Sequence, residues 1–174
     1  MADFVPAVDY VLQNEGGLVD NRKDNGGVTN WGITLPMLTT FRNKQCSNED
    51  LINLTQAEAK QLYESIFWNK LRVSGLNQAI ATAIFDMSVN NGQGVATRLA
   101  QECLGSQIVA DGVMGTDTLN ALDKVNVDMF IYNYVGLLQD RYVKICINAP
   151  DQITFLLGWL RRTRRLFTLI QGVS

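Results

Sequence analysis

Two carboxylates, a hydroxyl group and several glycines are spaced along one short stretch near the start of the chain. Glu15 is followed by two glycines, Asp24 comes nine residues later, and Thr29 comes five residues after that. Two carboxylates that flank a scissile bond are the minimal equipment for hydrolysis of a glycosidic bond, and a hydroxyl can orient the attacking water. The same residues also fit a purely structural interpretation, as a helix-end carboxylate and turn residues. Spacing alone leaves both interpretations open.

The elements around this stretch would place Glu15 at the end of a helix. Apolar residues recur every three to four positions over Phe4–Asn14, which predicts a helix that Glu15 closes before the glycine pair. The negative end of the helix dipole disfavours a charged carboxylate, and a general acid must keep its proton at neutral pH. Val28–Thr34 is predicted as a strand, so the Thr29 hydroxyl and the Trp31 ring, which can stack on a sugar, should share one face.

Composition excludes several classes of enzyme. The chain of 174 residues has no histidine, which rules out Ser-His and Cys-His hydrolases and His-ligated zinc enzymes. Cys46, Cys103 and Cys146 are too far apart in sequence for a metal cage, and nothing suggests a metal or an organic cofactor. A net charge of -2 argues against a general nucleic-acid binder, and a hydrophobic share of 47% is enough for a compact core.

The remainder of the chain is predicted to be helical. Gln78–Val89 is apolar almost all round, which is typical of a helix in the centre of a fold. Thr55 with Glu58 forms a capping-box signature at the start of another helix. The further helices are expected from Leu35 onward and at about Ser47–Leu54, Thr55–Trp68, Val95–Leu104, 116–122, Val127–Ile147 and Asp151–Ile170. We therefore expect a mostly α protein with one small β-hairpin after the first helix and a central buried helix.

The stretch around Glu15 resembles the opening motif of glycoside hydrolase family 108, a family of phage-type N-acetylmuramidases that cleave peptidoglycan. That motif is a glutamate followed by Gly-Gly, then Asp-x-Gly-Gly-x-Thr and a closing Gly-Ile-Thr. Here the positions read Glu15-Gly-Gly, Asp24-Asn-Gly-Gly-Val-Thr29 and Gly32-Ile-Thr34. The resemblance implies a lysozyme-like fold with Glu15 as the catalytic glutamate. An analogy with helical phage lysozymes suggests Asp24 and Thr29 as its catalytic partners.

Later segments extend the resemblance over nearly the whole chain. Phe85–Gly92 is similar to the family's central helix, and Asp111–Thr118 to a loop of the peptidoglycan-binding lobes attached to it. Phe155–Arg162 is similar to the Phe-x-x-Gly-Trp-x-x-Arg signature near the family's C-terminus. We therefore expect a catalytic part over residues 1–92 and a helical peptidoglycan-binding part over residues 93–174, packed as one compact unit. Substrate-binding side chains are predicted at Asn30, Trp31, Asn90 and Asn91.

The resemblance also implies what the protein acts on and where. The expected reaction is hydrolysis of the β-1,4 bond between N-acetylmuramic acid and N-acetylglucosamine, with Glu15 as general acid, by a monomeric endolysin with bacteriolytic, antimicrobial activity. Two alternatives remain: a lytic transglycosylase that forms anhydro-muramic products, and a non-catalytic accessory protein that binds the cell wall. No signal peptide is visible, so we expect accumulation in the host cytoplasm and release to the wall through a holin.

The C-terminal segment differs in charge from the rest of the chain. Residues 151–174 hold four arginines and one aspartate, a net charge of +3, whereas residues 1–150 hold 11 basic and 16 acidic side chains. A basic amphipathic helix can lie on an anionic outer-membrane or lipid surface. It can equally be a core helix whose arginines pair with the acidic body of the protein. Both interpretations stay open at this point.

Overall fold

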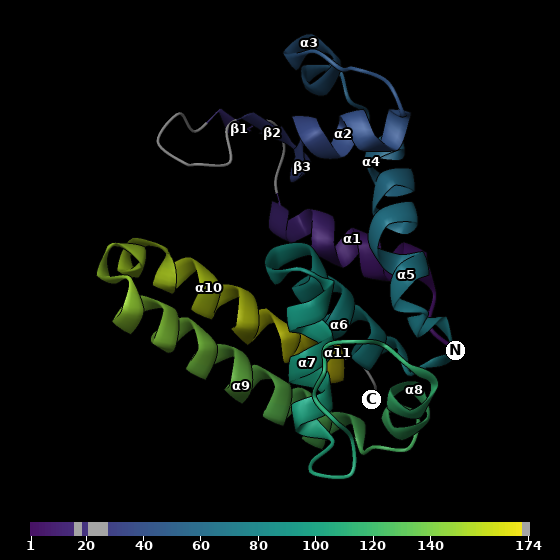
Figure 1. Ribbon diagram of the computed structural model, residues 1–174, viewed down its shortest axis with the longest axis vertical. Coiled ribbons are helices and arrows are strands. Elements are labelled where there is room, and N and C mark those ends of the chain that lie inside the picture. Colours follow the sequence, from purple (N-terminus) through teal and green to yellow (C-terminus); the bar gives the residue numbers. More distant parts are fainter. Residues whose placement is uncertain (16–18, 21–27, 172–174) are drawn as a thin grey trace. The chain divides into compact units, whose positions relative to one another are not determined.

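The computed structural model describes residues 1–15, 19–20 and 28–171, with only the backbone described for residues 19, 20 and 171. The chain forms two compact units (Figure 1). We call residues 4–70 the N-terminal unit, and residues 1–3 together with 71–174 the C-terminal unit. Within the described ranges, no helix is both long enough and apolar enough to cross a membrane.

The N-terminal unit begins with helix α1, Phe4–Glu15, as its apolar periodicity predicts. Ala7, Val8, Val11 and Leu12 are buried and form one stripe along the helix. This stripe fixes which side of α1 faces the core.

A small antiparallel sheet follows α1, and it confirms the predicted hairpin. Its strands are β1, Val19–Asp20, β2, Val28–Asn30, and β3, Ile33–Thr34, and β2 lies between the other two. Thr29 on β2 is paired with Val19 on one side and with Thr34 on the other.

The segment predicted as one strand, Val28–Thr34, is two strands joined by a tight turn. Trp31 and Gly32 form the turn, and both have positive φ, 52° and 73°. Two consecutive residues of positive φ are typical of a two-residue type I′ hairpin. Trp31 therefore lies in the turn and not on a strand, so the prediction that it shares a strand face with Thr29 is wrong. Glycine readily adopts a positive φ, but tryptophan rarely does. Trp31 therefore gave no sign of a turn within the segment predicted as a strand.

Side-chain caps begin the next helices of the N-terminal unit. Helix α2, Leu35–Arg42, is capped by Thr34, and helix α3, Asn48–Ile52, begins with a capping box formed by Ser47 and Asp50. Such caps satisfy backbone N–H groups that have no partner inside the helix. Both helices lie where the sequence predicts them.

The helix predicted from Thr55 to Trp68 is not regular. It consists of α4, Gln56–Tyr63, a π-helical segment η1, Glu64–Trp68, and a short α5, Asn69–Leu71. Thr55 caps α4 as predicted, because its hydroxyl accepts a hydrogen bond from the N–H of Glu58 at 3.2 Å. The reciprocal half of the predicted capping box is replaced by an ion pair. The Glu58 carboxylate accepts hydrogen bonds from Arg42 at 2.7 and 2.9 Å and so links α4 to α2.

Helix α6, Gln78–Asn91, is the central helix of the C-terminal unit. Every residue from Ala79 to Ser88 is buried, which confirms the predicted central buried helix. Helices α7, Gln93–Cys103, and α9, Val127–Asn148, both pack against it. The remaining elements are η2, Val73–Gly75, α8, Thr116–Leu122, η3, Pro150–Gln152, α10, Ile153–Leu166, and α11, Thr168–Gln171.

Helices α9 and α10 lie side by side as a helical hairpin (Figure 1). The last predicted helix, Asp151–Ile170, is interrupted at Phe167, between α10 and α11. The predicted boundary at residues 92–93 falls between α6 and α7, which pack together in the same unit. As a division of function, that boundary stays a prediction.

A buried ion pair joins α10 to α6. The Asp86 carboxylate is fully buried and accepts hydrogen bonds from Nε and Nη2 of Arg162 at 3.0 and 2.9 Å. The Trp159 ring stacks on the ring of Tyr142, with centroids 4.9 Å apart. This part of α10 therefore fits the core interpretation. The other basic residues of α10 are exposed, and we call them the exposed arginine cluster: Arg161, Arg164 and Arg165.

Candidate active site

Glu15 is the last residue of α1, and its side chain is half-buried. It follows Val8 by seven positions and Val11 by four, so it continues the buried stripe of the helix. The same apolar periodicity that folds α1 therefore directs a carboxylate toward the interior side of the N-terminal unit. A single carboxylate on such a stripe is a candidate for chemistry, because a charged group there gains nothing from hydrophobic burial.

The turn between β2 and β3 comes into close contact with the Glu15 carboxyl group. A Cβ atom placed on Gly32 would lie 2.7 Å from Oε2 of Glu15, 3.0 Å from its Cγ and 2.6 Å from the hydroxyl oxygen of Tyr63. Contacts under 3.0 Å are too short for a real Cβ, so any side chain larger than hydrogen at position 32 would displace a neighbour. The backbone of Gly32 thus packs directly against the carboxyl group of Glu15, the candidate acid.

Tyr63 completes this arrangement, and sequence analysis did not single it out. It is the last residue of α4, its side chain is fully buried, and its hydroxyl donates a hydrogen bond to the carbonyl oxygen of Trp31 at 2.9 Å. The ring also contacts Phe67, with centroids 5.9 Å apart. Three elements therefore meet at Glu15: the end of α1, the β2–β3 turn and the end of α4. Tyr63 lies far from the motif in sequence, and an apolar position on a helix gives no signal of this contact.

The other residues predicted in this motif are placed as follows. Thr29 is half-buried in the middle of β2, two residues before the turn, and Trp31 is half-buried within the turn. Asp24 lies outside the described residues. The catalytic roles of Asp24 and Thr29 and the substrate contact of Trp31 remain predictions.

Asn30 has a structural task inside the N-terminal unit. Its side chain is buried, and Nδ2 lies 3.0, 3.0 and 3.3 Å from the carbonyl oxygens of Leu51, Ile52 and Leu54. Leu51 and Ile52 are the last two residues of α3, and Leu54 follows that helix closely. Carbonyl oxygens at a helix end lack the full set of partners inside the helix. The Asn30 amide therefore fastens β2 to the end of α3, and its donor hydrogens are used within the protein. A contact of Asn30 with substrate stays a prediction.

Asn90 and Asn91, also predicted to bind substrate, end α6 in the C-terminal unit. Their amide nitrogens donate hydrogen bonds to the Tyr142 hydroxyl at 2.7 and 3.1 Å, and Nε of Arg141 donates to Oδ1 of Asn91 at 3.4 Å. Burial raises the pKa of Tyr142, so its hydroxyl stays neutral at physiological pH. The two asparagines therefore tie the end of α6 to α9, and a role in substrate binding stays a prediction.

The loop that resembles a peptidoglycan-binding motif is organised by one buried side chain, Gln101 on α7. Its Nε2 lies within hydrogen-bonding distance of Oδ1 of Asp111, the carbonyl oxygen of Val113 and the Thr118 hydroxyl, at 2.9, 3.0 and 3.1 Å. Its Oε1 accepts a hydrogen bond from the N–H of Gly112 at 2.8 Å. The polar residues of this motif therefore build the loop itself, whatever the loop binds.

Comparisons with known proteins agree with this architecture. Residues 8–92 match the family model described as Glycosyl hydrolase 108, and residues 95–164 match the one described as Predicted Peptidoglycan domain. The structure of SagA from Brucella abortus is similar over 97% of this chain and 94% of that chain, with 30% sequence identity and a TM-score of 0.83. A search among curated proteins found no match.

A mostly α, lysozyme-like fold with these two matched regions defines a glycoside hydrolase that acts on peptidoglycan. The chain belongs to glycosyl hydrolase family 108, as its motifs predict.

Proposed function

We propose that this protein is an N-acetylmuramidase that hydrolyses the β-1,4 bond between N-acetylmuramic acid and N-acetylglucosamine, with Glu15 as the general acid. The observation that supports this assignment is the position of the Glu15 carboxyl group. It is half-buried at the end of α1 and lies in contact with the Gly32 backbone. A proton donor must be held in a fixed position beside the bond that breaks. Hydrolysis of a glycosidic bond needs such a carboxyl group and no histidine.

In the proposed reaction, Glu15 donates its proton to the glycosidic oxygen as the bond from that oxygen to the anomeric carbon breaks. The electron pair of the bond leaves with the oxygen, and positive charge develops over the anomeric carbon and the ring oxygen. Asp24 stabilises this charge or helps to activate water, and Thr29 positions the water. Addition of the water oxygen to the anomeric carbon, with transfer of its proton to a carboxylate, completes hydrolysis. Carboxyl groups about 5–5.5 Å apart would give retention, and about 6.5–9.5 Å would give inversion.

The test of this proposal is the Glu15→Gln variant with purified peptidoglycan as substrate. We expect release of reducing ends to fall by about 10²–10⁴-fold with an unchanged thermal unfolding curve, since general acid catalysis contributes that much. Glu49→Gln is the matched control, because Glu49 is an exposed glutamate of the same unit on α3. Retention of more than about a tenth of the wild-type rate by Glu15→Gln would reject Glu15 as the acid. Mass spectrometry of the products separates hydrolysis from transglycosylation, because only the latter yields anhydro-muramic ends.

Three further expectations belong to the same proposal and rest on the family resemblance. The protein acts as a monomeric phage endolysin with bacteriolytic activity, it accumulates in the host cytoplasm, and a holin releases it to the wall. Contact of the exposed arginine cluster with an anionic outer-membrane surface would add to this activity, and charge complementarity supports that idea.

A further inference from the structure

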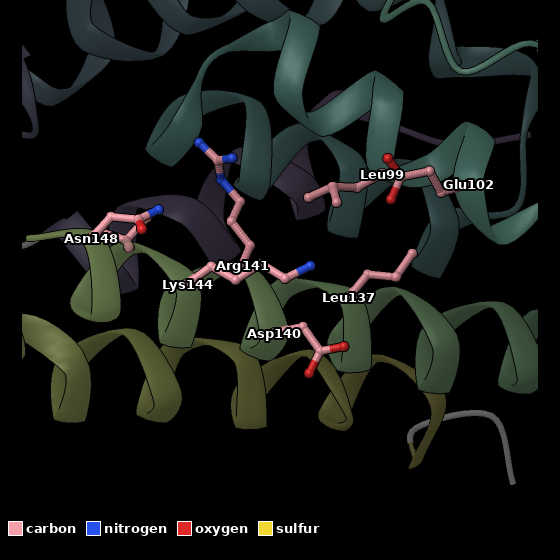
Figure 2. Close-up of a pocket in the computed structure, with 8 residues that line it drawn as sticks. Leu99, Glu102, Leu137, Asp140, Arg141, Lys144 and Asn148 are labelled. Atoms are coloured by element: carbon pink, nitrogen blue, oxygen red, sulfur yellow. The ribbon is translucent and has the colours of Figure 1, made fainter.

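A groove lies between α7 and α9 of the C-terminal unit, within the region that matches the Predicted Peptidoglycan domain (Figure 2). Its volume is about 290 Å³. Small-ligand sites span about 300–1,000 Å³, so this groove has room for only a small ligand fragment, such as one or two peptide residues.

The spacing of residues on the two helices explains the groove. Its α9 side is formed by side chains four, three and four positions apart, which therefore lie on one face of the helix. They are Leu137, Arg141, Lys144 and Asn148. From α7 come Leu99 and Glu102, three positions apart, and Figure 2 shows both side chains projecting from α7 into the space over α9. Leu99 and Leu137 add apolar surface to the two walls of the groove.

The groove is lined by charged side chains of both signs. Glu102 extends from α7, and Asp140 lies on α9 with its carboxylate directed away from α7 (Figure 2). Both also line a second hollow that continues past Gly136 along the same two helices. The Lys144 side chain extends back along α9 toward Leu137, whereas the Arg141 side chain extends toward α6, where its Nε lies 3.4 Å from Oδ1 of Asn91 (Figure 2).

These charges are available to a ligand. Glu102, Asp140 and Lys144 are exposed, and among the residues that the structure describes none of the three has a side-chain hydrogen bond or ion pair. Asp140 and Lys144 stand four positions apart on α9, a spacing at which opposite charges often pair on a helix. Here the two side chains stay apart, with the groove beside them.

The glycan strand of peptidoglycan offers little for such a site to recognise, because its acetylated sugars carry no amino groups and their carboxyl groups are linked to peptide. The peptide stem has the matching chemistry: free carboxylates, a free amino group on its diamino residue, and methyl groups of alanine that can contact Leu99 and Leu137. Charge-assisted hydrogen bonds from lysine or arginine to carboxylate, and from ammonium to carboxylate, are the stronger ones in proteins.

We propose that the α7–α9 groove binds the peptide stem of peptidoglycan, with the stem's ammonium group at Glu102 and a stem carboxylate at Lys144. This inference rests on the proposed action on peptidoglycan, and it adds the peptide as a second recognised part of the substrate. The groove would hold the wall through the peptide while the catalytic part acts on the glycan.

The binding test uses the full chain and a soluble probe, the N-acetylated tetrapeptide L-Ala-γ-D-Glu-L-Lys-D-Ala, in an NMR titration. We expect shifts at groove residues and a Kd that rises about tenfold in Lys144→Ala, the usual weight of one charge-assisted bond. Lys124→Ala, an exposed lysine of the same unit outside the groove, should leave the Kd unchanged. Acetylation of the peptide's lysine amine should weaken binding to the wild-type chain and have little effect in the Glu102→Gln variant.

Three results would overturn the inference: shifts confined to residues outside the groove, equal Kd values for Lys144→Ala and Lys124→Ala, or groove shifts caused by a peptide-free chitooligosaccharide instead of the peptide. A separate readout keeps the proposed function apart from it. Hydrolysis of peptide-stripped glycan strands should be lost in Glu15→Gln and retained in Lys144→Ala, while Glu15→Gln should bind the tetrapeptide as the wild type does. Hydrolysis retained in Glu15→Gln would refute Glu15 as the acid without touching the groove, and failure of the titration alone would refute the groove.

Discussion

Replacement of Gly32 by alanine should reduce catalysis by displacing the acid that rests on it. The new Cβ would lie 2.7 Å from Oε2 of Glu15 and 2.6 Å from the Tyr63 hydroxyl, whereas ordinary contacts begin at 3.4 Å. The carboxyl group or the turn must therefore move by about 0.7 Å, which exceeds the tolerance of about 0.5 Å within which a catalytic group stays productive. A misplacement of about 1 Å can cost 10²-fold, so we expect turnover to fall by about 10–100-fold.

The same substitution also strains the backbone, so stability must be measured with activity. A left-handed conformation costs an alanine about 1–2 kcal/mol, and the overpacked contacts add about 1–3 kcal/mol. Gly105→Ala is the matched control, because Gly105 has φ of +79°, close to the +73° of Gly32, and no atom within 4 Å of an added Cβ. Both variants are assayed by release of reducing ends at a temperature at which urea unfolding shows each to be folded. Equal turnover in the two variants would refute the argument that Gly32 supports the acid.

Other perturbations test the remaining contacts. Arg162→Met would remove the guanidinium group that pairs with the buried Asp86 carboxylate, so the free energy of unfolding in urea should fall by about 3–5 kcal/mol, and a loss below about 1 kcal/mol would contradict a buried ion pair. Changing the whole exposed arginine cluster to glutamine should spare activity on purified wall and reduce killing of intact cells with an outer membrane; equal killing would exclude membrane contact. Hydrogen bonds from Val113 N–H and Gln101 lower the pKa of Asp111 below 3.8, so its charged form stabilises the fold above that pH and the contribution is lost as pH falls through the lower folded-state value. The urea midpoint of the wild type should therefore fall more steeply below about pH 4 than that of Asp111→Asn, and parallel curves would contradict this.

Local patterns in the sequence predicted most helices and the position of the candidate acid. The period of α1 is set by its own apolar residues, so the end of that helix and Glu15 could be found directly. The caps at Ser47 and Thr55 are equally local, because each hydroxyl accepts a hydrogen bond from an N–H group fewer than four residues away. Where one segment decides its own conformation, sequence reasoning was sufficient.

Contacts between distant segments could not be predicted in the same way. Tyr63 meets the turn through a hydrogen bond to a carbonyl 32 positions earlier in the chain, and nothing near it signals this partner. Arg162 looked like one of four equivalent arginines until the fold placed it on a carboxylate 76 positions away. The positive φ of Trp31 was also hidden, because it depends on the hairpin and not on a preference of tryptophan. Long-range packing decided each of these features.

The salt link from Arg162 to Asp86 limits how this protein can be shortened or re-engineered. A chain truncated before Arg162 would keep the buried Asp86 carboxylate and lose the guanidinium group that pairs with it. Helix α10 is thus part of the folded C-terminal unit, although its exposed arginine cluster gives its outer face the composition of a free basic peptide. Fusions that aim to strengthen wall or membrane targeting should be appended beyond this helix, because it supplies the guanidinium partner of Asp86.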